Sequence, residues 1–158
     1  MGIEIERKFL LRDDSWRAAA DAGTRFVQGY LGGARCSVRV RREGDVACLN
    51  IKSLALGTTR QEFEYAIPVP DAEALLASFC DRSVEKIRYL VDFAGKRWEI
   101  DEFLGDNAGL VVAEIELERE DEPFQRPSWL GDEVTDDGRY YNVNLVKHPY
   151  RDWGRTPS

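Results

Sequence analysis

The feature that most constrains the fold is an alternation of charged and apolar side chains, two residues in period, that recurs along most of the chain. In its first segment, Glu4, Glu6 and Lys8 alternate with Ile3 and Ile5. Because residues two apart in a β-strand point to the same face, both carboxylates and the ammonium share one face. The pattern therefore predicts strands with one apolar and one charged face.

This alternation, read between turn signals, predicts eight strands. They span 2–11, 24–32, 36–43, 46–54, 58–68, 82–93, 96–104 and 109–119. Short turns that contain Gly44 and Gly95 favour hairpins, so neighbouring strands are expected to be antiparallel. Helices are predicted from Asp13 or Asp14 to Ala22, from Pro70 to Phe79, and from Arg139 to Lys147.

The charged faces carry pairs of like sign. These pairs are Glu4 and Glu6, Arg39 and Arg41, Glu62 and Glu64, Lys86 and Arg88, Glu99 and Asp101, and Glu114 and Glu116. At a spacing of about 6.6 Å and an effective dielectric of ~20, each pair costs on the order of 2 kcal/mol, and much less in open water. A solvated sheet face alone can produce alternation, but six like-signed pairs favour strands of opposite sign that face each other.

A sheet of this kind can close on itself, which removes its edges and turns the charged face inward. We therefore predict a mainly β (α+β) fold over residues 1–158, in which a closed eight-stranded antiparallel β-barrel forms a charged tunnel. Its apolar face lies outside, under a few flanking α-helices and a C-terminal helix. Such a tunnel, lined by about eight carboxylates and about eight basic groups, requires water, metal ions and a polyanion to satisfy its charges.

Composition excludes several classes of function. The formal net charge is −7 and the pI about 4.9, which argues against a nucleic-acid binder. No run approaches the ~18 apolar residues of a membrane span, and no signal peptide is evident, so a cytoplasmic protein without a membrane partner is expected. The three cysteines, Cys36, Cys48 and Cys80, lack metal-type spacing and are expected to be reduced.

The opening Glu4-Ile5-Glu6-Arg7-Lys8 resembles the ExExK signature of the CYTH domain, a family also called triphosphate tunnel metalloenzymes. The charged pairs downstream, together with Lys52, follow in the order expected of that family. Two further segments, 28–31 and 133–140, look like its short bacterial members, which are inorganic triphosphatases. The resemblance covers nearly the whole chain and implies that residues 1–158 form a single CYTH domain.

The resemblance implies a site that binds a triphosphate together with a divalent metal. The metal ligands it implies are Glu4, Glu6, Glu114 and Glu116. The phosphate-binding residues it implies are Lys8, Arg39, Arg41, Lys52, Arg60, Lys86 and Arg88. Glu4, Glu6 and Lys8 are also expected to take part in catalysis, and Glu62, Glu64 and Asp101 are candidates for a second metal or for orienting the attacking water. Hard carboxylate oxygens suit Mg²⁺ or Mn²⁺.

Other residues carry weaker expectations. His148, the only histidine, is expected at the surface. Tyr30 and Gln28 are evenly balanced between the site and structural support, as is Arg60. Tyr140 and Tyr141 are candidates to close one end of the tunnel. The basic residues also have a structural alternative, which is pairing with nearby carboxylates.

The expected activity is metal-dependent hydrolysis of inorganic triphosphate (tripolyphosphate) to pyrophosphate and phosphate. Thiamine triphosphatase, nucleoside triphosphatase and class IV adenylate cyclase remain alternatives, because they share the metal and phosphate apparatus. A polyphosphate-binding module without turnover is a further alternative. The expected partner is therefore a small-molecule triphosphate, and a homodimer is left open because an apolar outer face needs cover.

Overall fold

Strands dominate the fold, as the alternation predicts. The computed structural model describes residues 2–31, 36–53, 58–80 and 82–155. Within them the strands are β1 (Gly2–Leu11), β2 (Thr24–Tyr30), β3 (Cys36–Glu43), β4 (Val46–Ser53), β5 (Thr59–Ile67), β6 (Ser83–Phe93), β7 (Lys96–Phe103), β8 (Val111–Leu117) and β9 (Leu130–Glu133). The first eight match the predicted strands to within two residues at the described ends. Positions 32 and 54, predicted as strand ends, lie outside the described residues.

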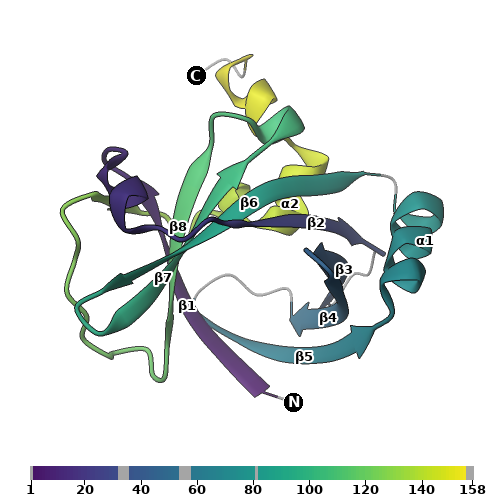
Figure 1. The fold of residues 1–158 in the computed structure, drawn as a ribbon, viewed down its shortest axis with the longest axis horizontal. Coiled ribbons are helices and arrows are strands. Elements are labelled where there is room, and N and C mark those ends of the chain that lie inside the picture. Colours follow the sequence, from purple (N-terminus) through teal and green to yellow (C-terminus); the bar gives the residue numbers. More distant parts are fainter. Residues whose placement is uncertain (1, 32–35, 54–57, 81, 156–158) are drawn as a thin grey trace.

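The strands form one antiparallel sheet that closes into a barrel (Figure 1). Their order is β5-β4-β3-β2-β6-β7-β8-β1-β9, and an additional pairing of β5 with β1 joins the two sides. In that closing pair, Glu4 lies opposite Arg60, so two strands of opposite charge meet. The predicted eight-stranded antiparallel barrel is therefore confirmed.

β9 is an additional strand that the sequence pattern did not predict. The N-terminal half of β1 pairs with β5, whereas Phe9 and Leu11 pair with Glu133 and Leu130 of β9. β9 thus pairs with the part of β1 that lies beyond the end of β5. At four residues, Leu-Gly-Asp-Glu, it is too short to present an alternating pattern.

The helices are fewer and shorter than predicted. α1 (Val69–Phe79) packs against β3 and β4 and matches the predicted helix, but the predicted helix from Asp13 or Asp14 to Ala22 is wrong. The chain there forms a single 3₁₀ turn, η1 (Ser15–Ala19), in which Asp13 accepts hydrogen bonds from Ser15. Ala20 then pairs with Val91 of β6, and this extended pairing ends the turn.

The predicted helix from Arg139 to Lys147 is divided. A 3₁₀ turn, η3 (Gly138–Tyr140), precedes α2 (Asn142–Lys147), with Tyr141 in extended conformation between them. Two further 3₁₀ turns, η2 (Gly105–Asn107) and η4 (Tyr150–Arg155), lie near each other. α2 lies against β6 and β2 (Figure 1). In the part of the chain that the structure describes, no helix is long and apolar enough to cross a membrane.

The principal core lies outside the barrel wall. Trp98 of β7 and Phe9 of β1 are fully buried on the outer face, with ring centroids 5.7 Å apart. Trp129, which precedes β9, covers Trp98 edge to face at 5.6 Å, and Trp16 of η1 belongs to the same cluster. Apolar burial on the outer face thus leaves the inner face free for charged side chains.

Candidate functional site

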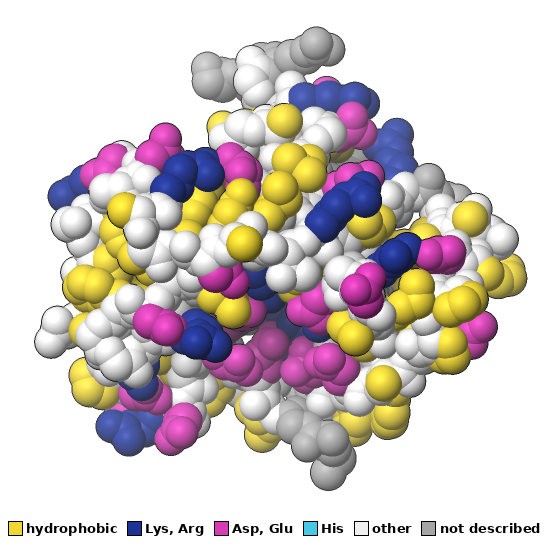
Figure 2. Space-filling model, in the orientation of Figure 1, with side chains coloured by type: hydrophobic (Ala, Val, Ile, Leu, Met, Phe, Trp, Pro, Cys, Tyr) yellow, Lys and Arg dark blue, Asp and Glu magenta, His cyan; other side chains and the backbone are white. Residues whose placement is uncertain are grey.

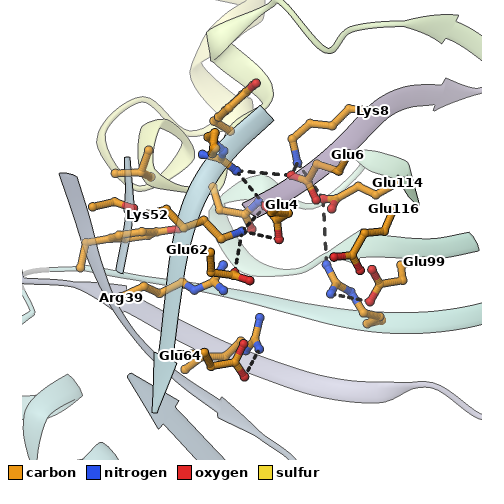
Figure 3. Close-up of a pocket in the computed structure, with 18 of the residues that line it drawn as sticks. Glu4, Glu6, Lys8, Arg39, Lys52, Glu62, Glu64, Glu99, Glu114 and Glu116 are labelled. Carbon is orange, nitrogen blue, oxygen red and sulfur yellow. Dashed lines mark hydrogen bonds and ion pairs between the residues drawn. The ribbon is translucent and has the colours of Figure 1, made fainter. Parts of the chain in front are cut away.

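The inner face of the barrel surrounds a cavity of about 220 Å³. Acidic and basic side chains gather around a hollow at the centre of the molecular face in Figure 2. The described lining residues are Glu4, Glu6, Lys8, Tyr30, Ser37, Arg39, Arg41, Lys52, Arg60, Glu62, Glu64, Lys86, Arg88, Glu99, Glu114, Glu116, Tyr141, Asn142 and Val143. Seven carboxylates therefore face seven basic groups (Figure 3).

Every residue predicted for the site lines this cavity except Asp101. Asp101 has no exposed surface and lies within the wall beside its neighbours on β6. Its oxygens accept a hydrogen bond from Lys86 at 2.8 Å and a pair of hydrogen bonds from Arg88 at 2.7 and 2.8 Å. Glu99, on the same face of β7, lines the cavity instead. The structure therefore places Asp101 behind two basic residues of the site.

Glu6 and Glu114 form the centre of an acidic wall on β1 and β8. Lys8 lies opposite Glu114 in the strand register, and Glu6 lies opposite Glu116. Burial and the neighbouring carboxylate of Glu114 raise the pKa of Glu6 to about 7. The pKa of Glu114 is instead well below its usual value, because Lys8 and Arg88 outweigh the effect of burial. Crowded carboxyl groups of this kind favour a nearby cation.

Lys8 is buried beside this acidic pair. Its Nζ lies 2.7 Å from an oxygen of Glu114 and 3.5 Å from one of Glu6. Burial alone would lower the Lys8 pKa, but Glu114 and Glu6 outweigh burial and raise it. Lys8 therefore stays protonated and keeps its charge for an anion.

Glu4 sits between two basic side chains from β4 and β5. Lys52 Nζ lies 2.8 and 3.1 Å from its two carboxylate oxygens, and Arg60 lies 3.6 Å from one of them. Lys52 also approaches Glu62 at 3.5 Å, while Asn50 donates a hydrogen bond to Glu62 at 2.9 Å. These pairs link the acidic side chains of β1 to the basic side chains of β4 and β5 (Figure 3).

Arg88 and Lys86 lie on β6, which β7 separates from the acidic wall. Arg88 also contacts Glu99 at 2.8 Å, in addition to Asp101. Lys86 is almost fully buried, and its Nζ donates to Asn142 Oδ1 of α2 at 3.1 Å. Burial lowers the pKa of Lys86 to about 8, although Asp101 opposes this effect. Lys86 therefore loses its charge at a lower pH than an ordinary lysine, whereas the raised pKa of Lys8 keeps that lysine charged.

Arg39 and Arg41 of β3 offer hydrogen-bond donors that protein groups only partly use. The Nε atom of each is buried and has no acceptor among the described residues. Arg41 reaches Glu43 and Glu64 only at 3.7 and 3.6 Å. Arg39 hydrogen-bonds the Tyr30 hydroxyl, an interaction that opposes the larger effect of burial on the raised pKa of Tyr30. Unused guanidinium donors are typical of a site for oxyanions.

The carboxylates suit a divalent cation in chemistry but are not yet arranged around one. Within the described ranges, no three acidic, cysteine or histidine side chains converge as they do around a bound metal. Lys8, Lys52 and Arg60 lie among the acidic groups and occupy their oxygens. The raised pKa of Glu6 nevertheless reflects the crowding of carboxylates on the β1 and β8 wall. Hard oxygen donors of this kind suit a divalent cation once the ion pairs loosen.

Several lining residues were not assigned to the site from sequence. Ser37, Asn142 and Val143 carry no charge pattern that could have marked them. Tyr141 lines the cavity whereas Tyr140 packs with Trp153, so only one of the two candidate tyrosines reaches the site. Tyr30 also lines it, while Gln28 is buried and donates to Asn142 at 2.6 Å.

Comparison with known proteins agrees with this architecture. An inorganic triphosphatase from Acetivibrio thermocellus is 47% identical over 155 residues, which cover 97% of this chain and 99% of that protein. An inorganic triphosphatase from Nitrosomonas europaea is 38% identical over 153 residues, covering 90% and 96%. The crystal structure of the inorganic triphosphatase NE1496 superposes with a TM-score of 0.65 at 34% identity, over 92% of this chain and 95% of that one.

A more distant structure shares the fold alone. The PH1012 protein from Pyrococcus horikoshii superposes with a TM-score of 0.58 at 16% identity, over 74% of this chain and 80% of that one. Residues 2–150 match the CYTH domain, a span that contains every lining residue of the cavity. Together with the charged barrel, these matches show that the chain belongs to the CYTH domain family.

Proposed function

We propose that this protein hydrolyses inorganic triphosphate to pyrophosphate and phosphate within the barrel cavity, with the help of Mg²⁺ or Mn²⁺. The observation that carries the proposal is the composition of the cavity, in which seven basic groups and seven carboxylates line one small space. A substrate made only of phosphate needs no other kind of contact. The two relatives named inorganic triphosphatase, at 47% and 38% identity, support the same substrate.

The basic residues would bind the phosphate oxygens. Arg39, Arg41, Arg60 and Arg88 can each donate two parallel hydrogen bonds, whereas Lys8, Lys52 and Lys86 act as point charges. Among the described residues, all of these groups except Arg39 form ion pairs with carboxylates, so substrate and metal would exchange one set of ion pairs for another. Positive charge is then in place where negative charge gathers on the transferring phosphoryl and the leaving group.

Glu4, Glu6, Glu114 and Glu116 would hold the divalent cation. Burial, together with the carboxylates of Glu4, Glu99 and Glu62, raises the pKa of Glu116, so positive charge on this wall favours its ionised form. When bound, the cation supplies positive charge that offsets the charge of the phosphate oxygens. Its binding would also favour the ionised form of Glu6, whose pKa is raised to about 7.

The attacking water would be oriented by Glu62 and Glu64. Hydrogen bonds from Asn50 and the charge of Lys52 outweigh burial and lower the pKa of Glu62, so this carboxylate stays an acceptor. Glu64 is the more exposed of the two, at 47% of its side chain, and water can reach it. Asp101 would act as a positioning residue that fixes Lys86 and Arg88.

The alternatives within the family need a surface for an organic group. Thiamine or a nucleoside presents a ring, yet Tyr30 and Tyr141 are the only described aromatic residues of the lining. Both hydroxyls are engaged, Tyr30 with Arg39 and Tyr141 with Thr135. Inorganic triphosphate is therefore preferred over thiamine triphosphate, nucleoside triphosphates and cyclisation of ATP.

The test is a substrate comparison with purified protein. Phosphate release is measured from tripolyphosphate, pyrophosphate, ATP and thiamine triphosphate, with Mg²⁺, with Mn²⁺ and with a chelator, and cyclic AMP is sought from ATP. We expect release from tripolyphosphate with either metal and none with chelator. Binding of tripolyphosphate without hydrolysis of any triphosphate would instead identify a binding module.

A further inference from the structure

We infer that Tyr141 is a positioning residue, which holds Lys8 and Arg60 side by side in the cavity and is itself fixed by the segment that follows β9. The inference rests on the proposed function, because it concerns how the cavity presents positive charge to a triphosphate. It assigns roles to Tyr141, Thr135 and the outward-facing Arg7.

The ring of Tyr141 lies against two cations of the site. Lys8 Nζ is 5.3 Å from the ring centroid, and Arg60 Cζ is 5.0 Å from it. Tyr141 is 6% exposed, so these contacts are largely shielded from water. The attraction between a cation and a ring face is stronger when water is excluded. One aromatic ring thus supports two like charges at once.

Both cations also lie within reach of a carboxylate, which is the alternative partner to the ring. Lys8 Nζ already lies 3.5 Å from Glu6, and Arg60 lies 3.3 Å from the same carboxylate. The two cations also repel, since Arg60 opposes the protonation of Lys8. Lys8 Nζ also lies 2.7 Å from Glu114, so loss of the ring would leave carboxylates as the main partners of both side chains, and these carboxylates would compete with phosphate more strongly. The ring therefore keeps positive charge available for the substrate.

Thr135 fixes the tyrosine relative to Lys8. The Tyr141 hydroxyl donates to the Thr135 carbonyl oxygen at 2.9 Å, and the Lys8 backbone N–H donates to Thr135 Oγ1 at 3.0 Å. The Val134 backbone N–H donates to the Lys8 carbonyl oxygen at 2.8 Å. One buried threonine thus holds the backbone of Lys8 and the ring on which its ammonium rests.

The same threonine is tied to the outside of the barrel. Thr135 Oγ1 donates to Glu133 at 2.6 Å, and Arg7 Nε donates to Glu133 at 2.8 Å. Arg7 points outward from β1, with its guanidinium 5.6 Å from the Phe9 ring and 5.0 Å from the Phe124 ring. Arg7, on the outer face of the barrel, therefore anchors the segment after β9 through Glu133. Thr135 of that segment in turn holds Tyr141 in the cavity.

The test compares Tyr141 with its neighbour Tyr140, which is almost as buried, at 9%, but packs with Trp153 away from the cavity. The variants are assayed for KM and kcat on tripolyphosphate with Mg²⁺, and for tripolyphosphate affinity by calorimetry in chelator, where no hydrolysis is expected. They are Tyr141→Leu, Tyr141→Phe and Tyr140→Leu. We expect Tyr141→Leu to raise KM and Kd about tenfold, with a smaller change in kcat. Tyr141→Phe keeps the ring and should stay within about threefold of wild type. Tyr140→Leu should lower Tm without a change in KM.

Three outcomes would overturn the inference: an unchanged KM and Kd in Tyr141→Leu, an equal rise in Tyr140→Leu, or no recovery in Tyr141→Phe. If Tyr141→Leu fails to fold, Thr135→Val is the second variant. It keeps the carbonyl that accepts from Tyr141 but removes the hydroxyl that holds Lys8 and Glu133, so it loosens the segment relative to Lys8. Its Kd is expected to rise about threefold, and an unchanged Kd overturns the inference. If the wild type binds tripolyphosphate without hydrolysing it, the proposed function fails, and the Kd comparison still decides the role of Tyr141.

Discussion

The two faces of the barrel wall differ more than any other regions of the molecule. In β7, Trp98 and Ile100 point outward and are fully buried among aromatic and aliphatic side chains. The alternate residues Glu99 and Asp101 point inward, toward Arg88. A shift of one position along the same strand thus separates an apolar core from a charged site.

The difference teaches which face stabilises the fold and which one is kept for function. Apolar burial on the outer face contributes roughly 25 cal/mol per Å². Buried ion pairs on the inner face lose much of their attraction to desolvation, and apolar groups in their place are often as stable or more so. Glu6, held partly protonated beside Glu114, illustrates the cost of crowding carboxylates. Substitutions on the two faces should therefore separate activity from stability.

The largest effect on activity is expected from Glu4→Gln. The amide keeps the shape of the side chain but loses the charge proposed to hold the metal, so kcat on tripolyphosphate should fall by roughly 1,000-fold, to background. The free energy of unfolding should also fall, because Lys52 and Arg60 lose their charged partner, so activity is compared at a temperature at which the variant is folded. Glu85→Gln, an exposed glutamate paired with Arg25 outside the cavity, is the matched control and should keep full activity. Normal turnover in folded Glu4→Gln would refute the metal assignment.

The largest effect on stability is expected from Trp98→Ala. This ring packs between Phe9, Phe124 and Trp129, so its loss should lower the free energy of unfolding by about 3 kcal/mol. Urea denaturation measures this change. KM for tripolyphosphate, assayed well below the new Tm, should stay at the wild-type value, because no atom of the outer cluster reaches the cavity lining. A raised KM at full folding would show that the two faces are coupled.

Arg39→Ala should weaken substrate binding more than turnover. The guanidinium lines the cavity with an unused donor, and the loss of a charged hydrogen bond should raise KM about tenfold or more. Arg42→Ala is the matched control on the same strand, because Arg42 points outward to Glu73 of α1. Steady-state kinetics measure KM and kcat for both variants. Equal KM values would contradict the role of Arg39 in phosphate binding.

The barrel could be predicted from the sequence because each strand lies between an apolar core and a charged cavity. The alternation of apolar and charged residues follows from these two environments. The alternation does not show how far along the barrel axis a side chain lies. Glu99 and Asp101 share a face, yet one lines the cavity and the other lies in the wall. Tyr140 and Tyr141 point to different clusters because the chain is extended between η3 and α2. β9 has only four residues and forms because β5 leaves the C-terminal part of β1 unpaired on that edge, not because of an alternating pattern of its own.

The smallest expected effect concerns pH. Burial lowers the pKa of Lys86 to about 8, so as pH rises through 8 this cavity-lining lysine loses the charge that would bind phosphate. At half a unit above its pKa, roughly a quarter of Lys86 remains protonated, and kcat/KM, which reports the free enzyme, should fall about fourfold from its plateau. Lys8 does not contribute to this decline, since its pKa is raised.

Lys86→Arg separates this decline from other titrations of the enzyme, metal and substrate. An arginine stays charged over the whole range, so the variant should lose the decline near pH 8 even if its kcat/KM is lower at neutral pH. Profiles of kcat/KM for both proteins, recorded at the same saturating metal concentration, make the comparison. A decline that persists unchanged in Lys86→Arg would place the titrating group elsewhere, and the deepest cation of the inner face would then be a structural partner of Asp101 rather than a ligand of phosphate.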